Sequence, residues 1–107
     1  VRVVLEEKCV SSCTLYTALL RDNLLCARPG TSLVFHRFVY IDDVKVDAQG
    51  RVTGYRIIGP AVGRVAAELW AVYPFSVRKK IMELSPVGLP RHGQELTIPA
   101  AELVPTC

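Results

Sequence analysis

The chain has 107 residues, half of them hydrophobic, and a formal net charge of +3. This length fits a single domain over residues 1–107 with its own core, and the apolar composition excludes a disordered tail. No apolar run approaches the ~18 residues that a membrane span needs, and residues 1–8 lack the order of a signal peptide. We therefore expect a cytoplasmic or already processed protein with no membrane partner. We also expect a homo-oligomer, because a composition this apolar suggests that a second copy covers part of the apolar surface.

The positive charge is concentrated in the middle of the chain. Residues 51–91 hold seven basic and two acidic side chains, a net charge of +5, whereas the two signs balance in residues 1–50. A basic segment on an otherwise neutral chain is a mild electrostatic indication of an anionic partner. It is much weaker than the basic stripe of a dedicated nucleic-acid-binding protein.

The first 30 residues predict a strand followed by a helix. Residues 1–5 are apolar and mostly β-branched, which is typical of a strand. Ser11 or Ser12 can cap the helix, because their side-chain oxygens accept hydrogen bonds from the free N–H groups of the first turn. Leucines at helical spacing from Leu15 onward give the helix one apolar face. The segment 27–30, with its Pro-Gly pair, ends it.

The segment 33–58 is the densest in β-branched and aromatic residues and predicts a long hairpin. Its turn is the segment 47–50, in which Gly50 can take the positive φ that lets the second strand pair back. The apolar alternation changes phase between Ile41 and Val44, across two consecutive aspartates. We therefore expect a β-bulge or a corner at Asp42 and Asp43.

Two further helices and a last strand complete the prediction. The Gly59-Pro60 pair begins the second helix, Pro74 ends it, and Ser76 caps a third helix over residues 77–84. The expected inward positions are Val62, Val65, Ala66, Leu69 and Tyr73 in the second helix and Val77, Ile81 and Leu84 in the third. With a strand at 95–98, the order of elements predicts an α+β fold. We expect a small, curved, mainly antiparallel sheet or partial barrel around the 33–58 hairpin, with two or three packed helices.

The four cysteines allow several interpretations. They stand at positions Cys9, Cys13, Cys26 and Cys107, without the paired Cys-x-x-Cys spacing of metal sites or redox motifs. Buried cysteines or two disulfides, with three pairings open, are the main expectation, and they predict no bound metal or other cofactor. Disulfides would imply an extracellular setting or a hyperthermophile cytoplasm. The alternative is a reactive thiol, best placed at Cys13, where a helix N-terminus would lower its pKa.

Two groups of residues suggest an anion or nucleic-acid site. The turn 59–64 follows a strand and opens a helix, so its free N–H groups together with Arg64 could hold an anion. Cations and aromatics also lie close in sequence on the hairpin and on the last two helices, and single-stranded nucleic acids are bound by such combinations. The candidate binding residues are Arg51, Arg56, Arg64, Tyr73, Arg78, Lys79 and Lys80.

Part of the sequence resembles a known superfamily. The segments 28–35, RPGTSLVF, and 50–58, GRVTGYRII, are similar to the central hairpin of PUA/ASCH-like domains. The resemblance covers about 30 residues of the hairpin region. The resemblance implies a small barrel that binds RNA or modified bases. At the position after Pro-Gly, where these domains usually have an acidic residue, this sequence has Thr31. The basic motif of the ASCH branch is absent, so no binding residue is transferred.

Three functional hypotheses follow from the sequence. The first is a non-catalytic binding domain for RNA or single-stranded nucleic acid, because no nucleophile-base spacing is found. The second, from a different class, is a homo-oligomeric structural or interaction module with no nucleic-acid role. The third is a thiol-dependent enzyme that works through Cys13.

Overall fold

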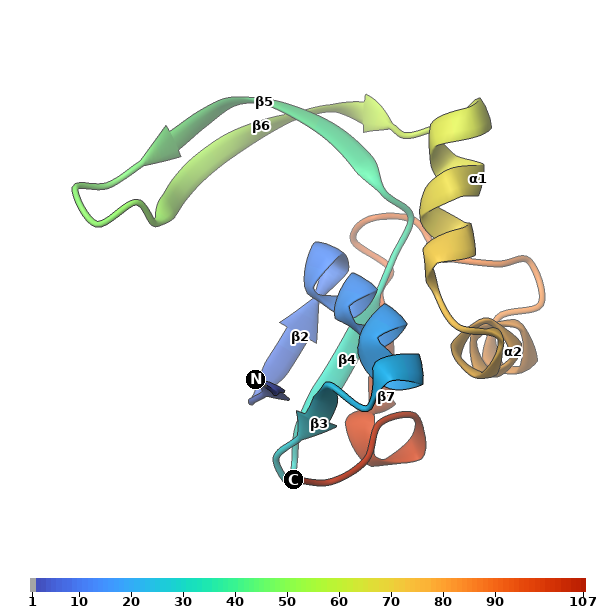
Figure 1. Ribbon diagram of the computed structural model, residues 1–107. Coiled ribbons are helices and arrows are strands. Elements are labelled where there is room, and N and C mark those ends of the chain that lie inside the picture. The colour runs from blue at the N-terminus through green and yellow to red at the C-terminus, as the bar shows by residue number, and fades with distance from the viewer. Residues whose placement is uncertain (1) are drawn as a thin grey trace.

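The chain forms a body built on small sheets and a long β-hairpin that projects from this body (Figure 1). The computed structural model describes residues 2–107. The α+β fold predicted from the sequence is confirmed, and within these residues no sheet closes into a barrel. We call the hairpin, residues 39–60, the arm.

Strand β4 (Ser32–Phe35) is the centre of the body. It lies between β2 (Lys8–Val10), which runs parallel to it, and β7 (Leu96–Pro99), which runs antiparallel. A separate parallel pair joins β1 (Val3–Leu5) to β3 (Leu25–Ala27). The sequence predicts β1, from its run of β-branched residues, and β7. It predicts neither β2 nor β3, which are three residues long and border the expected helix, nor the parallel pairings.

The first helix, η1 (Ser11–Asp22), is a 3-10 helix rather than an α-helix. In a 3-10 helix residues three apart lie directly above one another, and here Thr14 and Thr17 form such a buried column. The hydroxyl of Thr17 donates to the carbonyl of Thr14, and that of Thr14 donates to the carbonyl of Ser11. The predicted cap at Ser11 or Ser12 is wrong, because the N-cap residue is Val10 and it makes no side-chain capping bond.

Helix α2 (Phe75–Leu84) closes the core of the body. Its Val77 and Ile81 are fully buried, as predicted, whereas Leu84 is exposed. The helix begins at Phe75, one residue before the predicted cap. The core cluster of buried residues consists of Leu5, Cys9, Leu25, Ala27, Leu33, Phe35, Tyr73, Val77, Ile81, Ile98, Ala100 and Val104. Ala100 begins the short helix η2 (Ala100–Glu102), and Val104 follows that helix. No helix within residues 2–107 combines the length and the apolar character needed to cross a membrane.

Helix α1 (Gly63–Val72) is less buried than predicted. Of the five positions in its expected apolar stripe, only Tyr73, just beyond the helix, is buried, and Val62 and Val65 are exposed. The reason is the position of the arm, which projects away instead of lying under the helix (Figure 1). The predicted start at Pro60 is also wrong, because strand β6 continues through that residue.

The predicted hairpin is divided between the body and the arm. Its first part, β4, is buried in the body, and the chain leaves the sheet at residues 36–38. The arm itself consists of β5 (Val39–Val46) and β6 (Val52–Pro60), which pair antiparallel. Leu33 and Phe35 therefore face the core, whereas Val39 and Ile41, predicted on the same face, belong to the arm.

Candidate functional site

The turn at the tip of the arm is held by Asp47. One of its carboxylate oxygens accepts hydrogen bonds from the backbone N–H groups of Gln49 and Arg51, both at 2.9 Å. These bonds, that of Arg51 foremost, lower the pKa of Asp47. Gly50 takes a φ of 80°, as predicted, so the sequence places the turn correctly.

A β-bulge stands at the two aspartates, as predicted. Between Asp42 and Lys45, strand β5 has one residue more than the opposite segment of β6. Asp43 takes a left-handed φ of 50°, which Asp tolerates better than a β-branched residue does. Because side chains alternate along a strand, the extra residue returns Val44 to the face that carries Ile41.

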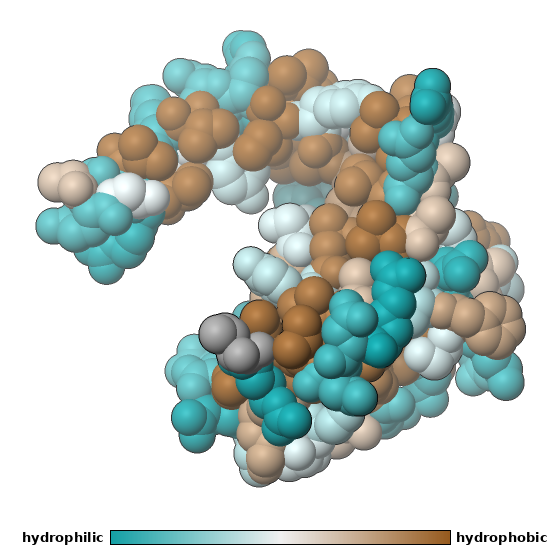
Figure 2. Space-filling model, in the orientation of Figure 1, coloured by the Kyte–Doolittle hydropathy of each residue, from teal (hydrophilic) through white to brown (hydrophobic). Residues whose placement is uncertain are grey.

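One face of the arm is therefore apolar along its whole length. Residues directly opposite each other on paired strands share a face, and Ile41 is opposite Ile57 while Val46 is opposite Val52. Figure 2 shows apolar residues along the arm. We call this surface the apolar face; its residues are Val39, Ile41, Val44, Val46, Val52, Tyr55 and Ile57. Apart from the half-buried Val39, these residues are 39% to 60% exposed.

The opposite face of the arm is polar and electrically balanced. Arg56 donates two hydrogen bonds to Asp42, which lies directly across from it, and Lys45 stands on the same face. This ion pair raises the pKa of Arg56. Over residues 39–60 the chain has three acidic and three basic side chains. The arm therefore presents no net charge to a partner.

The base of the apolar face borders a cleft between the arm and the body, with a volume of about 440 Å³. The arm contributes Val39, Ile41 and Tyr55 to it. The body contributes His36 and His92, whose rings meet edge to face with centroids 4.9 Å apart. The sequence gives no indication of this contact, because the two histidines come from separate loops.

Most of the cations predicted to bind an anion are paired with acidic side chains of the same chain. The pairs are Arg51–Asp47, Arg56–Asp42, Arg64–Glu68 and Lys80–Glu102. Arg51 and Arg56 belong to the arm, whereas the other cations are on α1 and α2, so the set forms no single cluster (Figure 1). The ring of Tyr73 lies in the core, where burial raises its pKa to about 12.

A smaller group of the predicted residues does come together on α2. Arg78 and Lys79 line a shallow hollow of about 500 Å³ with the aromatic rings of Trp70 and Phe75, and the acidic Glu83 lines it as well. Phe75 is 71% exposed. Within residues 2–107 no acidic side chain pairs with Arg78 or Lys79. We call this surface, formed by Trp70, Phe75, Arg78 and Lys79, the α2 patch.

The chain has no match among protein-family models, curated proteins or solved structures. Its function is therefore inferred from the geometry of the apolar face and the α2 patch.

All four cysteines are joined in disulfides. Cys9 pairs with Cys13, and Cys26 pairs with Cys107, which holds the C-terminal segment against β3. The disulfide expectation is therefore confirmed, and the sulfur of Cys13 is bonded rather than free. Two disulfides fit an extracellular or otherwise oxidising setting.

Proposed function

We propose that this chain is an interaction module that associates with a second copy of itself through the apolar face of the arm. The main support for this proposal is that the projecting two-stranded arm has seven apolar side chains on one face, and six of them are at least 39% exposed. An isolated two-stranded hairpin is at best marginally stable in water, and a packed partner layer supplies the missing burial.

The faces of the arm are better suited to this association than its edges. The ladder between β5 and β6 is interrupted at three points, so the strands bend and their outer hydrogen-bonding groups do not form a straight row. Bulges and charged side chains such as Lys45 are the usual means by which proteins prevent edge-to-edge pairing. Docking by added strands is therefore disfavoured, and packing through side chains is favoured.

The apolar face can pack against its own copy. It has no charged side chain, so a two-fold axis that brings two copies together creates no like-charge contact. Two sheets packed in this way lie ~10 Å apart with interleaved side chains. The exposed part of the apolar face is on the order of 600 Å² per copy, somewhat below the typical share of a specific interface. We therefore expect a reversible dimer.

Sedimentation equilibrium over a range of concentrations tests this proposal with two matched variants. Tyr55→Lys places a charge on the apolar face, and Tyr40→Lys makes the same exchange on the polar face, where Tyr40 is 42% exposed. The unmodified chain and Tyr40→Lys should move from monomer towards dimer as concentration rises. Tyr55→Lys should remain a monomer of 11.8 kDa, because a buried unpaired ammonium is costly.

Two results would contradict the proposal. One is a monomer at every concentration for the unmodified chain. The other is equal dimerisation of Tyr55→Lys and Tyr40→Lys, which would move the interface away from the apolar face.

A second candidate function is the binding of single-stranded nucleic acid at the α2 patch. It is supported by the exposed ring of Phe75 beside Arg78 and Lys79, since aromatic rings stack on bases and cations contact phosphates. The resemblance of the hairpin sequence to PUA/ASCH-like domains points to the same ligand class. The two functions use different surfaces, so variants of the arm and of α2 separate them.

A further inference from the structure

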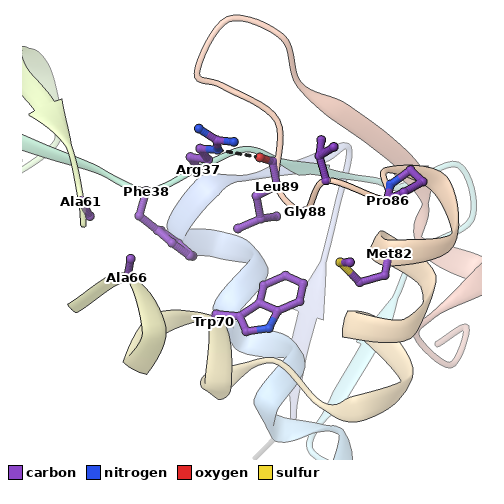
Figure 3. A pocket seen from close by; sticks show the side chains of 10 residues that line it. Arg37, Phe38, Ala61, Ala66, Trp70, Met82, Pro86, Gly88 and Leu89 are labelled. Atoms are coloured by element: carbon purple, nitrogen blue, oxygen red, sulfur yellow. Dashed lines mark hydrogen bonds between the residues drawn. The ribbon is translucent and has the colours of Figure 1, made fainter. Parts of the chain in front are cut away.

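A groove on the body is lined almost entirely by apolar side chains. It lies between α1, α2, the chain leaving β4 and the loop 86–89, and its volume is about 480 Å³. Figure 3 shows Phe38, Trp70, Met82 and Leu89 around a common space, with Ala66 at one side. This volume and this lining are typical of sites for small organic ligands.

Among the described residues that line this groove, Arg37 is the one with a charge. Its backbone N–H donates to the carbonyl of Pro90 at 2.7 Å, and its Nε donates to the carbonyl of Leu89 at 2.9 Å. These two bonds fix the position of the guanidinium over the loop. Within residues 2–107 no carboxylate pairs with Arg37, so its terminal N–H groups and its charge are open to an external anion.

We propose that the groove binds a small apolar carboxylate, such as a fatty acid or an aryl-substituted acid. The hydrocarbon part of the ligand occupies the space between Phe38, Trp70 and Met82, where its apolar surface is removed from water. The carboxylate accepts charge-assisted hydrogen bonds from Arg37, which present the fork geometry that this anion matches. The site is separate from the apolar face of the arm and does not depend on its association.

Fluorescence of Trp70 gives a direct test, because this is the only tryptophan of the chain and it lines the groove. Octanoate should cause a saturable change in emission, and octylamine should bind more weakly because it meets the like charge of Arg37. Arg37→Gln should lower the affinity for octanoate on the order of tenfold, as expected for loss of an ionic hydrogen bond. Arg64→Gln removes the same charge from an exposed position on α1 and should change nothing.

Octanol serves as the uncharged control. Arg37→Gln should bind octanol as the unmodified chain does, which shows that the groove is intact in the variant. The proposal is overturned if octanoate causes no saturable change, or if octanoate and octylamine bind equally. It is also overturned if Arg37→Gln loses octanol and octanoate together, because Arg37 would then only hold the loop in place.

Discussion

Ile41 on β5 lies directly opposite Ile57 on β6, and the bulge at Asp43 is what keeps the residues beyond this pair on the same face. With a side-chain period of two, a strand in which Asp43 paired regularly, without a bulge, would carry Val44 and Val46 on the polar face. The placement of Val44 and Val46 on the apolar face thus depends on this bulge, and that of Val52 depends on the register shift between Lys45 and Val46.

Deletion of Asp43 should preserve self-association, because it removes the bulged residue and leaves Val44 and Val46 in regular alternation with Ile41, on the apolar face. Asp43→Gly is the matched control: it retains the residue count, and Gly takes the φ of 50° without strain. Sedimentation velocity at one concentration compares the association of both variants with that of the unmodified chain. Loss of association in the deletion variant, with Asp43→Gly unchanged, would contradict the placement of the two valines on the apolar face.

The two disulfides should stabilise the fold to different extents. Cys26–Cys107 closes a loop of 81 residues and Cys9–Cys13 one of 4. The chain-entropy model gives about 4–5 kcal/mol for the long loop and about 2 kcal/mol for the short one. Urea unfolding of Cys26→Ala/Cys107→Ala and of Cys9→Ala/Cys13→Ala measures the two losses. A larger loss for the short loop, or four thiols free to alkylation without reduction, would contradict this assignment.

Tyr73 should make the fold sensitive to alkaline pH. Burial raises the pKa of Tyr73 to about 12, against a smaller opposite effect of the hydrogen bond with Thr14. The unfolded tyrosine has a pKa of about 10, so the folded state holds the phenol proton more tightly. This contribution is fully present below about pH 10 and is lost as the pH rises towards 12. A difference of this size corresponds to about 2–3 kcal/mol.

The variant Tyr73→Phe isolates this effect. It should lose about 1 kcal/mol at neutral pH with the hydroxyl, and its free energy of unfolding should then fall less between about pH 10 and 12 than that of the unmodified chain. Urea titrations at each pH provide the measurement. Parallel pH profiles for the two proteins would show that Tyr73 is not the group responsible.

The α2 patch predicts unequal effects of neighbouring lysines on nucleic-acid binding. Lys79→Ala should weaken the binding of a labelled single-stranded RNA and lower the salt slope by about one. Lys80→Ala should leave the affinity unchanged, because Lys80 is paired with Glu102, which also raises its pKa. Fluorescence anisotropy at several salt concentrations distinguishes them. Equal small losses in both variants would indicate only diffuse attraction to a basic surface.

The sequence predicts the arm well, because its signals are local. The turn at Gly50, the bulge at Asp43 and the α+β class all follow from alternation and turn chemistry. The burial of α1 does not follow, since its apolar stripe at Val62 and Val65 carries no information about which surface would cover it. In the 3-10 helix η1 the buried hydroxyls of Thr14 and Thr17 each bond to a carbonyl three residues back, a pattern that a search for leucine spacing overlooks.

The candidate site is predicted less completely, because its pairs of side chains depend on how the two strands of the arm are aligned. Only when β5 and β6 are aligned does Arg56 meet Asp42, and the arm then becomes neutral. The pair Arg64–Glu68 is visible in the sequence at a spacing of four, whereas Lys80–Glu102 depends on the tertiary fold. The apolar face itself is hidden in the sequence, because the bulge interrupts the period-two pattern.

Thiol footprinting of the arm tests most directly whether its apolar face is the surface of association. All four native cysteines are in disulfides, so a cysteine introduced by Val44→Cys or Lys45→Cys supplies a unique thiol on the apolar or the polar face, respectively. The rate of alkylation at Val44→Cys should fall severalfold as protein concentration rises, while the rate at Lys45→Cys should remain constant. Equal rates for the two variants at every concentration, or protection of Lys45→Cys alone, would contradict the proposed interface.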